Sequence, residues 1–493
     1  MLTRVRREGQ PTPQREEGNV ESNDAREGRT AGEAGWHASR YNLMAKVPGT
    51  RNVAIANLFK GTCAEYTPIE TYLLSVIDEL DENHPIIERL AKRGVICNFD
   101  ERAALDTMGR AACSFGRGIS LTICPTMGCN FDCPYCFEDH FAGRMSDEVQ
   151  DDIVALAERM LDAASAKNIH VTWFGGEPLL APDIIESLSG RLMALADGRG
   201  GTYDAGIITN GYLLTQEVAE MLGRCKVTEA QVTIDGLGAT HDATRRLAGG
   251  GPTFERIVAN LRGCKLPFSV LVRHNVREGN RHEVDKLQAF VERLAEESGN
   301  DISYYPAPVA ASEVADERGE QVGLLCGSDA SEIAVREEAG RFSRGRGHYC
   351  GAQSIWVIGI DERGNLQKCW EAVDKPALSF GTARDWDPSN PLETASNPDN
   401  LTRYLNTACP VPDDECRECV WLPMCTGGCP HKRLFSERKC VAFRDDPEAY
   451  VLALHARIGE KRQGAAAGTG KGTGDGNGSG VAEDGAGGDG SVE

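Results

Sequence analysis

Cysteine spacing constrains this chain more than any other feature of its sequence. Three of its 18 cysteines, Cys129, Cys133 and Cys136, form a CxxxCxxC run on one short segment. A cubane iron–sulfur cluster is closed by four thiolates, so three thiols would leave one iron open to another ligand. A closed zinc site would also need a fourth ligand, which makes a structural zinc loop the weaker alternative. The run therefore predicts a [4Fe–4S] cluster with a reactive iron.

A second set of cysteines lies in the last third of the chain. It has the spacing Cx13GxxxxC, then CxxCx5CxxxC, then one further cysteine. Zinc ribbons use CxxC knuckles that are less tightly spaced, so a zinc ribbon is the less favoured alternative. The set predicts further metal ligation by Cys350, Cys369, Cys416, Cys419, Cys425, Cys429 and Cys440.

Six other cysteines lie in apolar surroundings. Cys124 sits on an apolar run just before the CxxxCxxC motif, and a free cysteine packs as a small hydrophobic side chain. We expect core packing for it and for Cys63, Cys97, Cys113, Cys225 and Cys264.

Charge and hydropathy exclude several classes of partner. The formal net charge is −21 and no cluster of Lys and Arg stands out, which argues against nucleic acid or an anionic membrane surface. No window approaches the roughly 20 apolar residues of a membrane-spanning helix. We therefore expect a cytoplasmic protein, in which abundant cysteine indicates metal binding and not disulfides.

The two ends of the chain and a small N-terminal unit can be delimited from composition. Residues 1–36 are polar and residues 464–493 are rich in Gly and Asp, so both are expected to be disordered. Residues 37–115 should form a separate α+β unit of hairpin and helices. Its two strands are predicted at Tyr41–Val47 and Asn52–Leu58, around a Pro-Gly-Thr turn.

Two helices should complete this N-terminal unit. Thr67 and Glu70 have the spacing of a capping box, which predicts a helix start at this point. The helix is expected to bury Ile69, Tyr72, Leu73 and Val76. A second short helix is predicted over Pro85–Lys92 and should end at Gly94.

Residues 116–305 alternate short apolar runs with amphipathic segments. Strands are predicted at Ile119–Ile123, His170–Phe174, Gly206–Thr209, Ala230–Ile234, Phe268–Arg273 and Ile302–Tyr305. Helices are predicted near residues 146–164, 182–196, 215–223, 253–263 and 282–297. This alternation indicates an α/β fold with a parallel sheet, in which the reactive site lies at the carboxyl ends of the strands.

Loss of periodicity and the cysteine positions delimit three further segments after residue 305. Residues 306–349 are expected to be an irregular bridge with a helical patch near 331–340. Residues 350–445 form the cysteine-rich segment, which is expected to be held together more by metal than by apolar burial. Residues 446–463 should form a helix.

Together, the CxxxCxxC run and Gly175-Gly176-Glu177-Pro178 resemble a radical S-adenosylmethionine (SAM) enzyme. The second cysteine set resembles the SPASM domain, which carries auxiliary clusters in peptide- and protein-modifying members of that family. The resemblance implies a partial (β/α)6 barrel and three [4Fe–4S] clusters. It also implies that SAM is cleaved to a 5′-deoxyadenosyl radical that abstracts hydrogen from a substrate.

The family resemblance also implies contacts to SAM. Gly175, Gly176, Glu177 and Pro178 would bind its amino group, and Tyr135 would lie against its adenine. Residues at the strand ends would contact its ribose or carboxylate, although plain turn and capping chemistry is an equal alternative: Thr209, Asn210, Thr233 and Asp235. The resemblance assigns no catalytic side chain.

By position in the SPASM pattern, the second cysteine set divides into two clusters. One would be held by Cys416, Cys419, Cys425 and Cys440, and the other by Cys350, Cys369 and Cys429. The fourth ligand of the latter could be Cys326 or Cys409, or its iron could stay open for a substrate thiolate.

Two differences from anaerobic sulfatase-maturing enzymes favour the subfamily of maturases of ribosomal peptides. Anaerobic sulfatase-maturing enzymes carry an Asp directly after the cysteine that corresponds to Cys369, where this chain has Trp370-Glu371. The N-terminal unit is typical of maturases of ribosomal peptides, in which it can bind a leader peptide as an added strand; packing on the barrel alone is an equal alternative.

We therefore expect a maturase that forms a thioether or other crosslink in a precursor peptide with leader and core. A reductase, ferredoxin or flavodoxin would supply electrons. The alternatives are a sulfatase-type maturase that oxidises Cys or Ser to formylglycine, and a non-enzymatic iron–sulfur or zinc protein.

Overall fold

The computed structural model describes residues 35–114, 118–309, 349–408, 411–435, 440–441 and 443–468. Most of the chain ends and of the 306–349 bridge with its helical patch lie outside these residues, as do Cys326 and Cys409. The predicted start of disorder at residue 464 was wrong, because the last helix continues to Gly468. Within the described ranges, no helix has both the length and the apolar character needed to cross a bilayer.

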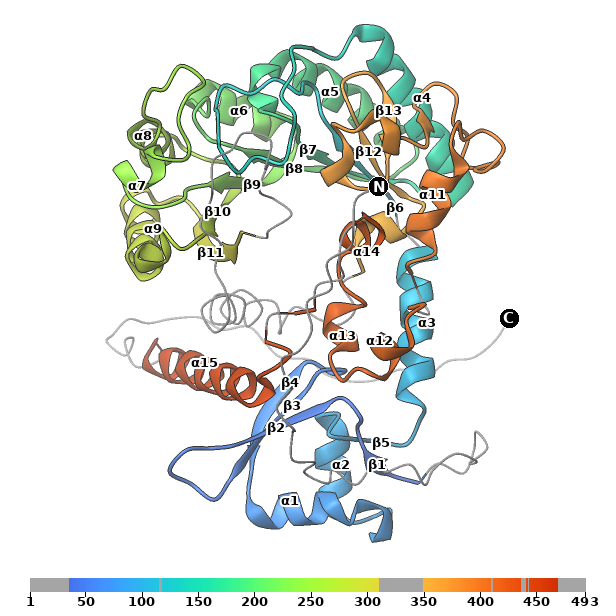
Figure 1. Cartoon of the computed structure of the whole chain (residues 1–493), viewed down its shortest axis with the longest axis vertical. Helices are drawn as coiled ribbons and strands as arrows, with labels where there is room; N and C mark the ends of the chain where they lie inside the picture. The colour runs from blue at the N-terminus through green and yellow to red at the C-terminus, as the bar shows by residue number, and fades with distance from the viewer. Residues whose placement is uncertain are drawn as a thin grey trace, which may run out of the picture.

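A nine-stranded sheet organises the upper part of the molecule (Figure 1). Six of its strands run parallel to their neighbours in sequence order, which confirms the predicted α/β class. They are β6 (Gly118–Ile123), β7 (Asn168–Trp173), β8 (Tyr203–Thr209), β9 (Val227–Thr233), β10 (Ser269–Val276) and β11 (Ile302–Pro308).

Helices between these strands cover one face of the sheet. They are α4 (Asp147–Ala164), α5 (Pro182–Gly198), α6 (Gln216–Arg224), α7 (Ala239–Asp242), α8 (Phe254–Gly263) and α9 (Val284–Ser298). Alternate strand side chains such as Leu121 and Val171 are fully buried in one core with helix residues such as Leu156 and Leu188. Each strand therefore has a buried face and a second face that is free to carry polar groups, as period-two alternation requires.

Part of the cysteine-rich segment extends this same sheet. Strand β12 (Val357–Ile360) pairs in parallel with β6, and β13 (Asn365–Gln367) and β14 (Gly381–Thr382) follow in antiparallel. Buried Ile358 and Trp386 belong to the main core. The expectation that metal would mainly hold this segment together was therefore wrong for its first half. The strands instead satisfy backbone groups that would be unpaired at the β6 edge.

The N-terminal unit contains the predicted hairpin together with a third strand. Its antiparallel sheet has the order β2 (Asn42–Lys46), β3 (Val53–Asn57) and β4 (Thr62–Tyr66), and β1 (His37–Ala38) pairs with β5 (Ile96–Cys97). The helices are α1 (Pro68–Ser75), α2 (Pro85–Lys92) and α3 (Glu101–Ser114). Helix α3 runs from this unit toward the large sheet (Figure 1).

The buried face of α1 differs from the prediction. Thr67 and Glu70 form the expected capping box, but Ile69 is 72% exposed and Tyr72 is 65% exposed. Leu74 and the following Ile77 are buried instead. They pack in a core with Ile55 of β3, so tertiary contact and not the local pattern sets the rotation of this two-turn helix.

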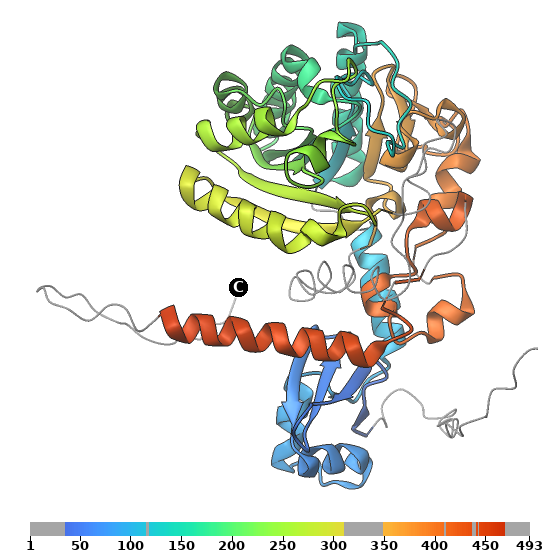
Figure 2. The same ribbon diagram turned by 60° about the vertical axis from the view of Figure 1, so that its left-hand side comes forward.

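The last helix of the described residues packs on the N-terminal unit. Helix α15 (Pro447–Gly468) lies across the three-stranded sheet (Figure 2). One core combines Tyr41 and Leu43 of the N-terminal unit with Trp421, Phe443 and Tyr450. The shorter elements between are α11 (Pro398–Leu405), α12 (Asp414–Glu418), α13 (Leu422–Cys425) and α14 (Pro430–Phe435).

Candidate functional site

The CxxxCxxC loop connects β6 to α4 at the carboxyl end of the sheet. Phe131 forms an isolated β-bridge with Leu247. The amide of Asp132 donates to the carbonyl of Arg246 at 3.0 Å, and the amide of Ala248 donates to the carbonyl of Asn130 at 2.9 Å. The loop before α8 therefore holds the middle of the cysteine loop in a defined conformation.

The three thiols of this loop line a cavity of about 280 Å³. Six of the residues predicted to contact SAM line it too: Tyr135, Gly175, Gly176, Thr209, Asn210 and Thr233. Burial raises the pKa of the Cys129 thiol to about 12. Because iron binds the thiolate, a buried thiol of this kind would lose its proton on metal binding.

The glycine turn after β7 is packed against the segment that leads into the cysteine loop. Gly175 has φ +106°, and a Cβ there would overlap the carbonyl oxygen of Thr126. A Cβ on Gly176 would overlap the carbonyl oxygen of Gly128. Both positions therefore require glycine, because no side chain fits between the two backbones.

Glu177 lies behind the cavity wall and not in it. Its buried carboxylate accepts hydrogen bonds from the Thr209 hydroxyl at 2.7 Å, the Asn210 amide at 2.7 Å and the Leu179 amide at 3.0 Å. Burial raises the pKa of Glu177, and these donors oppose the shift. In this arrangement the carboxylate positions Thr209 and Asn210. Its contact with a SAM amino group remains a prediction.

Tyr135 is held by three polar side chains. Its hydroxyl donates to Asp235, while Nη1 of Arg245 donates to the Tyr135 oxygen at 2.9 Å and Nδ2 of Asn275 approaches it at 3.4 Å. Asp235 is fully buried. Burial raises the pKa of Asp235 and the Arg245 guanidinium opposes the shift. The network fixes the Tyr135 ring at the cavity wall.

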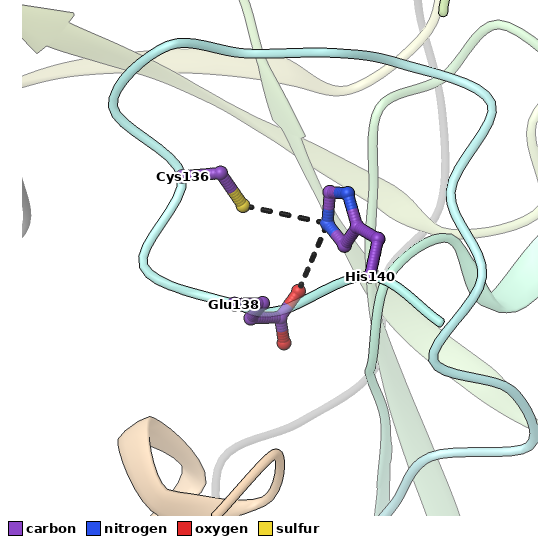
Figure 3. A group of neighbouring side chains, drawn as sticks. All are labelled: Cys136, Glu138 and His140. Atoms are coloured by element: carbon purple, nitrogen blue, oxygen red, sulfur yellow. Dashed lines mark hydrogen bonds and ion pairs between the residues drawn. The ribbon is translucent and has the colours of Figure 1, made fainter. Parts of the chain in front are cut away.

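Cys136 has a histidine and a glutamate beside it (Figure 3). Nε2 of His140 lies 3.5 Å from Cys136 Sγ and 3.9 Å from a carboxylate oxygen of Glu138. Burial, reinforced by nearby Asp374, raises the pKa of Glu138 to about 8. The three ligand atoms lie within 4.8 Å of one another, a spacing that could also hold a single metal ion.

The cysteine-rich segment supplies part of the cavity wall. Trp370 and Glu371, directly after Cys369, both line the cavity. Trp370 is 47% exposed, and its ring centroid lies 5.7 Å from that of Phe174. Aromatic side chains from two segments that are distant in sequence therefore meet beside the glycine turn.

A second cavity of about 520 Å³ brings together cysteines of the C-terminal set. It is lined by Cys350, Cys416, Cys419, Cys425, Cys429 and Cys440. Burial raises the pKa of Cys425 to about 11, and neighbouring Cys419, Cys416 and Cys440 add to the shift. Burial likewise raises the pKa of Cys369, with contributions from Cys350 and Cys429. The cavity therefore brings together thiols of both groups that the SPASM pattern implies. Their division between two clusters stays a prediction.

The cysteines in the described ranges form no disulfide. Cys124, Cys97, Cys113 and Cys225 are buried, and Cys63 and Cys264 are partly buried. The donor chemistry of the gathered thiols fits iron–sulfur clusters, because several cysteines line each of the two cavities.

Comparison with known proteins identifies the domain around the first cavity. The radical SAM superfamily model matches residues 123–276. This chain carries a radical SAM domain. The match confirms the resemblance inferred from the cysteines, and it includes the cysteine loop, the glycine turn and the strand ends.

Relatives of this radical SAM domain differ in how much of their length is matched. The AdoMet-dependent heme synthase of Methanosarcina barkeri is 33% identical over 34% of this chain and 46% of its own length. The mycofactocin maturase MftC of Mycobacterium ulcerans is 26% identical over 65% of this chain and 86% of its own length. This chain spans about half the length of the first two curated relatives it matches.

Solved structures show the same fold. The structure of anSMEcpe with bound AdoMet has a TM-score of 0.52 and 20% identity, and the match covers 71% of this chain and 96% of that chain. The shared fold extends well beyond the radical SAM domain.

Sequence reasoning missed several residues of the first site. Arg273 and Asn275 lie toward the carboxyl end of β10 and line the cavity with Arg245, Gln231 and His140. Arg273 and Asn275 could have been predicted, because sites in parallel sheets form at the carboxyl ends of the strands. Nothing local in the sequence marks Arg245, which reaches the cavity from a distant loop. Trp370 was marked only by its position directly after Cys369, and its place in the cavity wall was not predicted.

Proposed function

We propose that this protein is a SPASM-type radical SAM enzyme that modifies a peptide. The observation that carries the proposal is the first cavity, where three thiols of the cysteine loop meet the glycine turn and the Trp370 wall. Cys129, Cys133 and Cys136 would hold a [4Fe–4S] cluster whose open iron binds SAM and delivers the electron that releases a 5′-deoxyadenosyl radical.

The chain's own residues would bind and orient SAM. Gly175 and Gly176 expose backbone beside the cysteine loop, where no side chain would obstruct the amino acid part of SAM. Tyr135 presents an aromatic ring for the adenine, fixed by Asp235 and Arg245. Thr209, Asn210 and Thr233 offer polar groups in the wall of the same cavity.

A peptide substrate is supported by the cavity mouth and by the relatives. Trp370 and Glu371 present an apolar and a charged contact next to the SAM site. Curated relatives include a mycofactocin maturase and cysteine-type sulfatase-maturating enzymes. Because Trp370 stands where sulfatase maturases carry Asp, we favour crosslinking of a carbon, through a thioether or carbon bond, over formylglycine formation.

The N-terminal unit would bind the leader of the precursor peptide. Within the described residues, β4 has β3 as its single strand neighbour, so its other edge can accept an added strand. A leader held there would direct the core peptide toward the radical SAM cavity.

Two auxiliary [4Fe–4S] clusters complete the proposal. Cys416, Cys419, Cys425 and Cys440 would hold one, and Cys350, Cys369 and Cys429 the other, with Cys326, Cys409 or a substrate thiolate as its fourth ligand. A reductase, ferredoxin or flavodoxin would supply the electron. Such clusters and thiols suit a reducing, cytoplasmic setting.

The deciding experiment is anaerobic reconstitution followed by a SAM cleavage assay. The wild-type chain should bind about twelve irons and release 5′-deoxyadenosine under dithionite. The variant with Cys129→Ala, Cys133→Ala and Cys136→Ala should lose about a third of the iron and all SAM cleavage, while Cys225→Ala should change neither. Continued cleavage by the triple variant would contradict the assignment.

A further inference from the structure

Two arginines contact thiols of the second cavity. Nη1 of Arg433 lies 3.6 Å from Cys416 Sγ, and Nη1 of Arg444 lies 2.8 Å from Cys440 Sγ. Both thiols belong to the group of four that also contains Cys419. In each contact a guanidinium N–H donates to sulfur, and such a bond becomes stronger when the sulfur is a thiolate.

Neighbouring acceptors hold both guanidinium groups in place. Arg433 is 12% exposed in its side chain and faces Asp413 at 3.9 Å. It also donates to the Gly427 carbonyl at 2.6 Å. Asp413 in turn accepts from the Cys416 amide at 3.2 Å, so one carboxylate orients both the arginine and the cysteine.

The second arginine is anchored in a similar way but is more open to solvent. Arg444 donates to Glu415 at 2.8 Å and its side chain is 37% exposed. Water screens an exposed charge, so its effect on the sulfur should be weaker than that of Arg433.

The other group of C-terminal thiols has different neighbours. Among the hydrogen bonds of the described residues, none joins an arginine to Cys350, Cys369 or Cys429. The nearby Lys368 directs its ammonium to the carbonyls of Ser354 and Val357. The two groups therefore differ in hydrogen bonding to sulfur.

We propose that Arg433 and Arg444 raise the reduction potential of the cluster held by Cys416, Cys419, Cys425 and Cys440 above that of its neighbour. Reduction adds negative charge to the cluster, and N–H···S bonds and positive charge stabilise the reduced form. Cys350 and Cys429 line the same cavity, so the two clusters would be adjacent. An electron shared between them would reside mainly on the arginine-bonded cluster. This inference depends on the proposed cluster assignment.

The test is an EPR-monitored redox titration of the full-length reconstituted protein. The signal of this cluster is identified by its loss in Cys425→Ala. Arg433→Gln should lower the midpoint so that the ratio of reduced to oxidised cluster at a fixed potential falls about tenfold, which is about 59 mV for one electron. Arg444→Gln should shift it less in the same direction. Arg224→Gln, a surface arginine paired with Glu186, should leave it unchanged.

The Asp413→Asn variant distinguishes an effect of Arg433 on the reduction potential from a purely structural role of Arg433. Asn can still accept from the Cys416 amide, but it removes the negative charge beside Arg433, so the midpoint should rise. A purely structural role would instead lower the iron content of both Arg433→Gln and Asp413→Asn. If Arg433→Gln loses the cluster, the midpoint potential of Arg444→Gln tests the inference, since it should still be lower than that of the wild type.

Unchanged midpoints in Arg433→Gln and Arg444→Gln, with full iron content, would overturn the inference and leave the proposed function intact. A wild-type protein that binds only about four irons would instead contradict the cluster assignment itself.

Discussion

The hydroxyl of Thr209 donates to the buried carboxylate of Glu177 at 2.7 Å and so joins the end of β8 to the turn after β7. The same carboxylate accepts from the Asn210 amide. Two positions that line the first cavity are therefore set by one buried acid that does not itself line it.

Replacing Glu177 should lower both the unfolding free energy and the affinity for SAM. Glu177→Gln would direct an amide N–H2 at donors that need an acceptor, which we expect to cost about 1–3 kcal/mol of unfolding free energy. SAM affinity should fall as Thr209 and Asn210 lose their positions. Urea unfolding and SAM titration measure the two effects. Glu158→Gln on the surface of α4 is the matched control, and equal behaviour of the two variants would contradict the linking role.

Trp370 should act on the substrate more than on the fold. Trp370→Ala removes a half-exposed ring that packs at a tilt against Phe174, so the unfolding free energy should change by about 1 kcal/mol or less. We expect turnover of the cognate peptide to fall at least about tenfold, a larger loss than that of SAM cleavage. Phe99→Ala, which removes another exposed aromatic ring, provides the control. Parallel losses of turnover and SAM cleavage in Trp370→Ala would count against a substrate contact.

The shared C-terminal and N-terminal core predicts a stability effect across both units. Tyr450 is fully buried, with ring centroids 5.1 Å from Trp421 and 4.5 Å from Phe443. Tyr450→Ala should cost about 3–5 kcal/mol and expose the N-terminal sheet to proteolysis. Limited proteolysis and thermal unfolding test this, with partly buried Leu452→Ala as the milder control. Protection of the N-terminal unit in Tyr450→Ala would show that it folds independently of α15.

Acid should destabilise the protein through a buried histidine. Burial lowers the pKa of His274 to about 4, against an ordinary value of 6.5. The unfolded chain therefore binds a proton below pH 6.5 that the folded chain cannot, and stability falls as pH drops from 6.5 toward 4, by up to about 3 kcal/mol. Urea unfolding at pH 7.5 and 5.5 should show a smaller pH dependence in His274→Gln. The exposed His282→Gln should retain the wild-type dependence.

The sequence alone was enough to place three thiols on one loop and to predict the class of the fold. The spacing of Cys129, Cys133 and Cys136 is local, so three thiols must share one loop whatever the rest of the chain does. Alternation of short apolar runs with amphipathic segments likewise depends on neighbours in sequence, and the six strands formed where it predicted them. The capping box at Thr67 is also local and was formed as expected.

Tertiary structure alone decided which distant segments meet. Val357 pairs with Ser120, more than two hundred residues earlier, and this pairing brings Trp370 to the first cavity. Tyr450 joins a core with Tyr41 from the other end of the chain, and α1 buries Leu74 and not Ile69. Such contacts depend on which surfaces remain unpaired after the local elements have formed. Local periodicity does not contain that information, because burial is a property of the whole fold.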